Sequence, residues 1–326
     1  MNIQRRSMIK LGAGLCVGAA VGRPAWAQSY PSRPVTLVVP FAPGGNTDIV
    51  GRTIATALAK VLGQSVVVDN KSGAGGSIGA SQVARSDPDG YTLLLCGAGV
   101  IVTVPQMVKT SYSRDSFTPL GLVNKSSMVL LVRGNDERFK TLKDFAEYAR
   151  AEPSRLNAAH SGPGTPNHLA LLQTESLLKA QFTVLSYKGA NPALISLLGG
   201  QIDAMFDQVP SCLPHIKSGA LKALAVLGPE RDPIIPDVPT IAELGFGNID
   251  GTTYVGILGP SGMPKDLQNQ LVNLIAQAVK DPQAVKSATE LGSVAYSSTP
   301  QEFTDVLNAE YAVATQAAKD GRLKVD

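Results

Sequence analysis

Residues 35–50 read VTLVVPFAPGGNTDIV, and this stretch decides the fold class. Its first five residues are apolar or β-branched, which predicts a strand buried on both faces. From Ile49 onward, apolar residues recur at helical spacing until Gly63, and glycine commonly ends helices. A buried strand that leads directly into a helix begins a βαβ unit. The sequence therefore predicts an α/β protein with a mostly parallel sheet covered by helices.

The alternation of strands and helices continues along the chain in two series. The first series has further strands at 66–69 and 91–95. The second has strands at 128–132, 156–159, 182–185, 204–206 and 221–226, separated by helices at 142–151, 166–179, 192–198 and 210–218. The apolar run 254–258 is expected to cross back to the first series, and helices at 264–280 and 301–318 follow it.

Two domains are expected from this order, because about 300 residues are enough for two cores of ordinary size. Domain 1 is predicted to contain residues 28–126 and 254–300, and domain 2 residues 127–253. Residues 301–326 are predicted to form a C-terminal helix that packs across both domains. The chain would cross between the domains near 124–128 and 251–254.

The first 27 residues have the pattern of an export signal. Arg5, Arg6 and Lys10 precede an apolar stretch that is too short to span a bilayer, and small residues around Ala27 suit cleavage there. The paired arginines favour a twin-arginine signal, and an ordinary secretory signal is the alternative. We therefore expect a periplasmic protein.

Charge and cysteine content narrow the classes of partner. Four of the 29 cationic residues and none of the 26 acidic ones lie in the first 27 residues, so the remaining chain has a net charge of about −1. A nearly neutral chain gives no support to a nucleic-acid partner or an acidic membrane surface. Cys96 and Cys212 each lie in an apolar stretch, which favours buried thiols. A disulfide between them is the alternative interpretation.

Two glycine-rich junctions between a strand and a helix are candidate anion sites. One reads PFAPGGNTD over 40–48, and the other reads HSGPGTPNH over 160–168. Glycines let the backbone approach a ligand, and Thr47 and Thr165 are placed as helix caps. Helix N-termini attract anions, so two of them offered from two domains would hold an anion between them. Ordinary capped turns are the alternative reading of either junction alone.

Several short segments, which follow one another in a fixed order from Tyr30 to the C-terminus, resemble the Bug (TctC) family. These are the periplasmic solute-binding proteins of tripartite tricarboxylate transporters. The segments are YPSRP (30–34), VPFAPGG (39–45) with Asp48, GAGG (73–76), PDGYTLL (88–94), Gly164-Thr165 with His168-Leu169, YKG (187–189), LGGQID (198–203), Phe206-Asp207, LPHIK (213–217) and DVPT (237–240).

The resemblance implies a type II periplasmic binding protein, a Venus flytrap of two α/β domains. It implies a monomer that holds a small organic carboxylate without a cofactor and delivers it to membrane components of a transporter or to a sensor. The implied ligand contacts are Phe41, Pro43, Gly44, Gly45, Thr47, Asp48, Ala98, Gly99, Ser161, Gly162, Gly164, Thr165, His168, Tyr187 and Asp207. The chain departs from its relatives at 97–99, where they often have a hydroxyl residue, and at Gln208, where they usually have asparagine.

Gly75 to Gly79 match the G-x-S-x-G pattern of serine hydrolases, with Ser77 as the nucleophile of an alternative, enzymatic function. A nucleophile elbow needs its serine on the turn that leaves the strand, whereas residues 70–76 intervene here. The spacing argues against Ser77 as a nucleophile.

Some polar residues near the junctions have more than one interpretation. His160 and His168 lack cysteine or acidic neighbours, so no metal site is expected. His168 is either a ligand donor or a satisfied helix residue, and Asp48 either contacts ligand or stabilises its own helix N-terminus. Asp207 would repel a bound carboxylate unless it meets an amine, a hydroxyl group or water.

Overall fold

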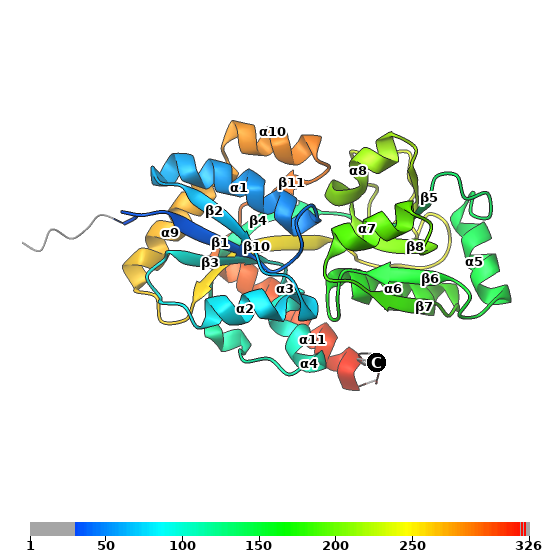
Figure 1. The fold of residues 1–326 in the computed structure, drawn as a ribbon, viewed down its shortest axis with the longest axis horizontal. Helices are drawn as coiled ribbons and strands as arrows, with labels where there is room; N and C mark the ends of the chain where they lie inside the picture. Colours follow the sequence, from blue (N-terminus) through cyan, green and yellow to red (C-terminus); the bar gives the residue numbers. More distant parts are fainter. Residues whose placement is uncertain (1–29, 320, 322, 324–326) are drawn as a thin grey trace, which may run out of the picture.

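The computed structural model describes residues 30–319, 321 and 323. The predicted export signal, its paired arginines and the cleavage site near Ala27 lie outside the described residues. The chain forms two units, each built on one sheet, that lie side by side along the long axis of the molecule (Figure 1).

The first unit contains a six-stranded sheet of order β11-β4-β10-β3-β1-β2. Its strands are β1 (Val35–Val39), β2 (Val66–Asn70), β3 (Thr92–Cys96), β4 (Phe117–Ser126), β10 (Thr253–Pro260) and β11 (Val294–Ala295). β1 pairs in parallel with β2 and β3, whereas β10 runs antiparallel to both β3 and β4. β10 is reversed because it brings the chain back from the second unit.

The second unit contains a five-stranded sheet of order β7-β6-β8-β5-β9. Its strands are β5 (Met128–Arg133), β6 (Asn157–His160), β7 (Thr183–Ser186), β8 (Ala204–Gln208) and β9 (Leu221–Val226). β6 is parallel to β7 and β8, and β5 is antiparallel to β8 and β9. In both sheets, a strand next to a crossing between the units runs against its neighbours.

Helices cover both faces of the first sheet, as the apolar run of β1 predicts. Leu37 and Val39 pack against α1 (Asn46–Leu62) and α9 (Lys265–Val279), while Val38 faces α2 (Ser77–Ala84), α3 (Ala98–Val102) and α11 (Pro300–Lys319). Alternate side chains of a strand point to opposite faces, so every apolar residue of β1 is buried. The unit is completed by α4 (Val104–Met107), α10 (Pro282–Glu290) and two short 3-10 turns, η1 (Ala74–Gly76) and η2 (Arg114–Ser116).

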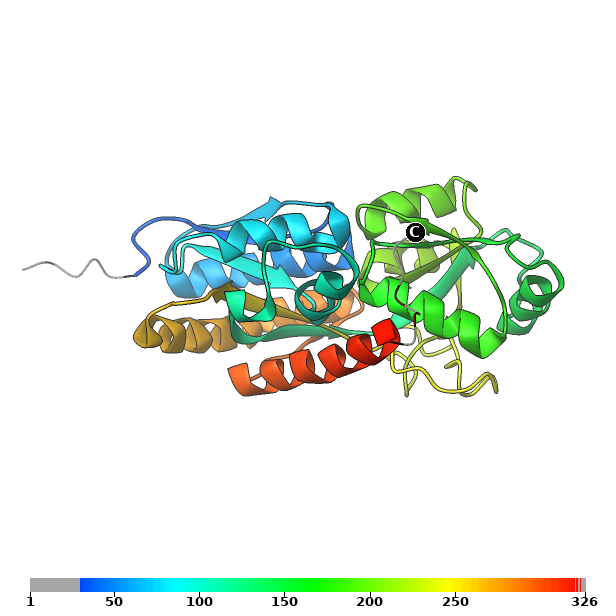
Figure 2. The same cartoon turned by 90° about the horizontal axis from the view of Figure 1, so that it is seen from below.

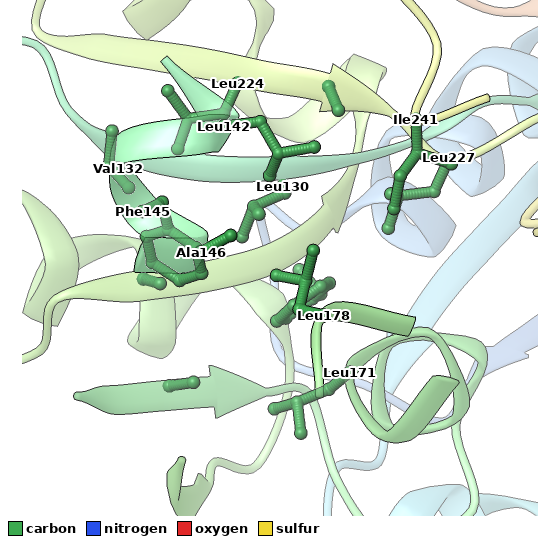
Figure 3. Close-up of a cluster of buried hydrophobic side chains, with 14 of the residues drawn as sticks. Leu130, Val132, Leu142, Phe145, Ala146, Leu171, Leu178, Leu224, Leu227 and Ile241 are labelled. Carbon is green, nitrogen blue, oxygen red and sulfur yellow. The ribbon is translucent and has the colours of Figure 1, made fainter. Parts of the chain in front are cut away.

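The second sheet is covered in the same way. Leu130 and Val132 of β5 pack with Phe145 of α5 (Leu142–Ala151) and Leu171 of α6 (Pro166–Leu178) (Figure 3). Val129 and Leu131 face the opposite side, toward α7 (Ala190–Leu198) and α8 (Val209–Lys217). Each unit therefore has its own core on each face of its sheet.

Two segments connect the units and lie next to each other. β4 runs into β5 through Ser127, and β10 begins at Thr253, paired with Ser126. The Ser126 and Thr253 hydroxyl groups, both buried, form a hydrogen bond of 2.9 Å. α11 packs on α3 and β4 and runs beneath the first unit toward the second (Figure 2).

Some elements differ from those expected. β4 carries Pro119 and Gly121, which disfavour a strand, yet it pairs with β10 on one side and β11 on the other. α2 and α10 also lie where no helix was predicted. Within the described residues, no helix combines the length and apolar character that crossing a membrane requires.

Candidate functional site

A cavity that is open to solvent at its mouth lies between the two units. The first unit contributes Phe41, Gly45, Asn46, Thr47, Gly97 and Val100, the second contributes Ser161, Thr165, Pro166, Asn167, Ala190 and Gln208, and the returning strand contributes Thr253, Tyr254 and Val255. None of these lining residues carries a charged side chain. A ligand here would be held by uncharged groups from both units.

Helices begin at the cavity from both sides. α1 starts after Gly45, α6 after Thr165 and α7 after Gly189, and neither α1 nor α7 has a side-chain cap. The first N–H groups of a helix have no partner within it, and they carry the positive end of the helix dipole. The uncapped start of α1, with Gly45, Asn46 and Thr47 at the cavity, therefore favours an anion.

The first junction is held in shape by Asp48, whose carboxylate turns away from the cavity and into its own unit. It accepts hydrogen bonds of 2.9 Å from the Gly44 N–H and from Arg52, and one of 3.0 Å from Asn70. Burial alone would raise the pKa of Asp48, but the hydrogen bonds from Arg52, Gly44 and Asn70 outweigh it and the pKa is lowered. Gly44 has a φ of +84°, which favours glycine there.

The second junction is held by Thr165, which caps α6 as predicted. Its hydroxyl oxygen accepts from the His168 N–H at 3.4 Å, while its proton goes to the Gly162 carbonyl at 2.7 Å. The prediction for Thr47 was wrong, because the N-cap of α1 is Gly45 and Thr47 is the second residue of the helix. Its side chain is therefore left to line the cavity.

The two junction histidines stack on each other behind the second loop, with ring centroids 4.1 Å apart. His168 accepts from the Gly164 N–H at 3.3 Å, and His160 contacts Gly162. Burial lowers the pKa of His168 to about 4, and burial together with His168 lowers that of His160 to about 3. Both rings are neutral near pH 7 and support the loop from beneath. The described residues contain no cluster of His, Cys, Asp and Glu side chains that could hold a metal ion.

Asp207 is fully buried at the end of β8, behind two amides that line the cavity. It accepts hydrogen bonds from the Gln208 N–H at 2.9 Å, from Asn167 at 3.2 Å and from the Ser211 hydroxyl group. Burial raises its pKa to about 6, although these hydrogen bonds act in the opposite direction. Asn167 and Gln208 also pair with each other, with the Gln208 Nε2 donating to Asn167 Oδ1 at 3.3 Å. Asp207 therefore positions lining groups rather than lining the cavity itself.

The structure places five of the predicted ligand contacts on the cavity wall: Phe41, Gly45, Thr47, Ser161 and Thr165. The others are not among its lining residues: Pro43, Gly44, Asp48, Ala98, Gly99, Gly162, Gly164, His168, Tyr187 and Asp207. Lining residues that the sequence did not single out include Asn46, Asn167, Thr253 and Tyr254. Thr253 and Tyr254 could have been predicted from the sequence, because a strand that crosses between two units passes the space between them.

Several of the remaining predicted glycines bring the two units into contact. A Cβ atom on Gly162 would lie 3.1 Å from the Gly75 Cα, and one on Gly99 would lie 2.8 Å from the Gly164 carbonyl oxygen. The backbones of the two units therefore touch at these positions, and larger residues would hold the units apart.

Among the described residues, none gives Ser77 the surroundings of a catalytic serine. It is the first residue of α2, separated from β2 by the turn η1, and it is only 8% exposed. Among the described residues, no histidine or acidic side chain forms a hydrogen bond with its hydroxyl group. The geometry of a nucleophile elbow is absent from this part of the described chain.

Two α/β units joined by paired crossing segments, with helix starts converging on the space between them, define a bilobal solute-binding protein. The receptor family of the tripartite tricarboxylate transporters ("Tripartite tricarboxylate transporter family receptor") matches residues 50–321 of the chain. The chain belongs to this family, as its resemblance to Bug proteins predicted.

Solved structures agree with this assignment. The periplasmic binding protein BugD is 36% identical and superposes with a TM-score of 0.86, over 91% of this chain and 100% of that chain. MatC from Rhodopseudomonas palustris, solved with bound malate, is 33% identical with a TM-score of 0.84, over 89% and 100%. A second R. palustris protein, solved with adipate, is 31% identical with a TM-score of 0.85, over 89% and 97%. The predicted two-domain fold of a periplasmic binding protein is confirmed.

The buried histidine pair generates a prediction about acid stability. The unfolded chain protonates His168 below a pH of about 6.5, but the folded protein resists protonation down to its pKa of about 4. Stability contributed by the neutral ring is therefore present above pH 6.5 and is lost as the pH falls toward 4. When the pH falls from about 7.5 to about 5, we expect the free energy of unfolding of wild type to decrease by about 2 kcal/mol more than that of His168→Asn, which keeps an acceptor for Gly164.

Urea unfolding at the two pH values measures this difference. His215→Asn, which replaces a half-buried histidine of α8, controls for the loss of a histidine in general. An equal effect of pH on wild type and on His168→Asn would contradict the neutral, buried state of the ring.

Proposed function

We propose that this solute-binding protein captures a small organic carboxylate in the cavity between its two units. The observation that carries the proposal is the convergence of helix N-termini from both units on a cavity without charged lining residues. Such a site attracts an anion through backbone N–H groups and helix dipoles, without the desolvation of a buried lysine or arginine. Malate and adipate in the two related structures are carboxylates of this kind.

The contacts proposed for the carboxylate come first from the cavity wall. Gly45 and Thr47 supply the start of α1, and Ser161 supplies a hydroxyl group from the second unit. Thr165, whose own proton goes to the Gly162 carbonyl, holds the start of α6 in place. Hydroxyl and backbone N–H donors to a carboxylate are charge-assisted, so a few of them suffice for binding. Asp48, His168 and Asp207 act indirectly in this proposal, by shaping the two junctions.

The family supports delivery of the solute to the membrane components of a tripartite transporter, and a sensor is the alternative recipient. We propose the two units as domains that close on the ligand, domain 1 being 28–126 with 254–300 and domain 2 being 127–253. The hinge would lie at 124–128 and 251–254, where Ser126 and Thr253 are paired. A ligand that touches both domains stabilises the closed arrangement.

Matched ligands test the anion site. Thermal shift and calorimetry with malate and adipate should detect binding, whereas the corresponding amides should bind at least tenfold more weakly because they lack the charge. Gly45→Pro removes one N–H at the cavity, and the φ of −83° at Gly45 is close to that of proline. Loss of one charge-assisted hydrogen bond costs about 1.5–3 kcal/mol, so the affinity of the Gly45→Pro variant for these carboxylates should fall roughly tenfold to a hundredfold.

The melting temperature of the unliganded Gly45→Pro variant is the control for folding. If the amides bind as well as the acids, the site does not recognise an anion and the proposal is wrong.

Closure can be tested at Gly99, whose Cβ position is blocked by the Gly164 carbonyl oxygen of the other unit. Gly99→Ala keeps the N–H group and an ordinary helical backbone, so it should leave domain 1 folded while obstructing closure. We expect weaker carboxylate binding and, in small-angle scattering, less compaction on adding ligand than in wild type. Gly228→Ala, where the nearest atoms are 3.7 Å away, is the matched control. Compaction of Gly99→Ala equal to that of wild type would count against closure through this contact.

Export is proposed to use the first 27 residues, with Arg5-Arg6 as a twin-arginine signal and cleavage near Ala27. In a cell with a working general secretory pathway, Arg5→Lys with Arg6→Lys should leave the precursor in the cytoplasm. Arg23→Lys, outside the paired motif, should be exported normally. Fractionation and immunoblotting measure both, and periplasmic accumulation of the double variant would refute the twin-arginine route.

A further inference from the structure

Asn46 has a buried side chain whose hydrogen-bonding capacity is unused. It is the first residue of α1, it lines the cavity between the units, and it is only 4% exposed. Its Oδ1 atom is buried without a hydrogen-bond partner, and its Nδ2 atom makes no hydrogen bond to a described residue. A buried amide left unpaired is costly, so this position calls for a partner that enters the cavity.

The other amides of the cavity wall differ from Asn46 in this respect. Asn167 donates to the Phe206 carbonyl at 2.8 Å and pairs with Gln208 and Asp207. Both lining amides of the second unit are therefore engaged within the protein. Among the lining amides that the structure describes, Asn46 alone is left for a ligand.

The position of Asn46 indicates where the ligand's own hydrogen-bonding group would be. Its backbone belongs to the uncapped start of α1, which favours the carboxylate, and its side chain leaves from the same residue. One ligand can reach both only if its polar group lies close to its carboxylate, as on the adjacent carbon.

The charge of the wall decides which polar group fits. An ammonium group would need an acidic partner, yet no lining residue is acidic. Asp48 and Asp207, the acids behind the junctions, already accept hydrogen bonds on both of their carboxylate oxygens. A neutral hydroxyl group can donate to Asn46 Oδ1 without bringing an uncompensated charge into the cavity.

We propose that Asn46 is a specificity-determining residue that selects 2-hydroxycarboxylates, and this rests on the carboxylate-binding function proposed above. The carboxylate lies at the start of α1 and the adjacent hydroxyl group pairs with the Asn46 amide. A carboxylate without that hydroxyl group leaves the amide unpaired, so the site discriminates against it.

Calorimetry with two matched pairs, malate against succinate and lactate against propionate, tests this assignment. In wild type, the hydroxylated member of a pair should bind tenfold or more tightly than its partner, equivalent to about 1.4 kcal/mol. Asn46→Ala and Asn46→Leu should bring this ratio close to one, mainly by weakening the hydroxy acid. Asn46→Leu should also leave the unliganded protein at least as stable as wild type, because it removes a buried unpaired amide.

Thr315→Val is the matched control, since Thr315 of α11 also has a buried, unpaired side-chain oxygen but lies outside the cavity and the hinge. It should keep the preference for hydroxy acids. Equal binding of hydroxylated and deoxy acids by wild type, or a preference that survives in Asn46→Leu, would overturn the role of Asn46 while leaving carboxylate capture intact. Failure of every carboxylate to bind wild type would overturn both proposals.

Discussion

Backbone N–H groups at the start of a helix have no partner within that helix, and this constraint organises the molecule. The starts of α1, α6 and α7 are directed at one cavity, from two units that are separate in the fold. Because the attracting groups belong to the main chain, the cavity needs no buried cation to favour an anion. The arrangement is complete only where the two units meet, which links binding to their relative position.

Buried acids form hydrogen bonds that fix the shape of the chain at the starts of α1 and α6. Asp48 holds the first junction through Gly44, Arg52 and Asn70, and Asp207 holds the second unit's amides through Asn167 and the Gln208 N–H. Asp48 has a cationic partner and a lowered pKa, whereas Asp207 has hydroxyl and amide donors and a raised one. Both carboxylates accept hydrogen bonds from groups within the protein. Each therefore shapes the cavity without presenting a repelling charge on its wall.

Glycine at the contact between the units has a second role beside turn formation. Gly75 and Gly162 meet with backbone atoms close enough that a Cβ on Gly75 would lie 2.3 Å from the Pro163 carbonyl oxygen. Gly99 and Gly164 meet in the same manner. Such approaches bring the second junction into backbone contact with the first unit. The glycines that the family resemblance suggested as ligand contacts thus set the width of the site.

The sequence by itself determined the α/β class, both glycine-rich junctions and most strands, since each depends on a local period or a local turn. Leu142–Ala151 and Leu221–Val226 have the predicted bounds because their apolar patterns are strong over their whole length. Tertiary structure decided β4, in which Pro119 and Gly121 pair with β10 beside a register irregularity, while β11 pairs further along the strand at Asn124 and Lys125. It also decided which polar residues of the junctions line the cavity. Asn46, Asn167 and Asp48 are alike in sequence as polar residues near a helix start, and only the groups folded against them determine whether their hydrogen bonds are already made.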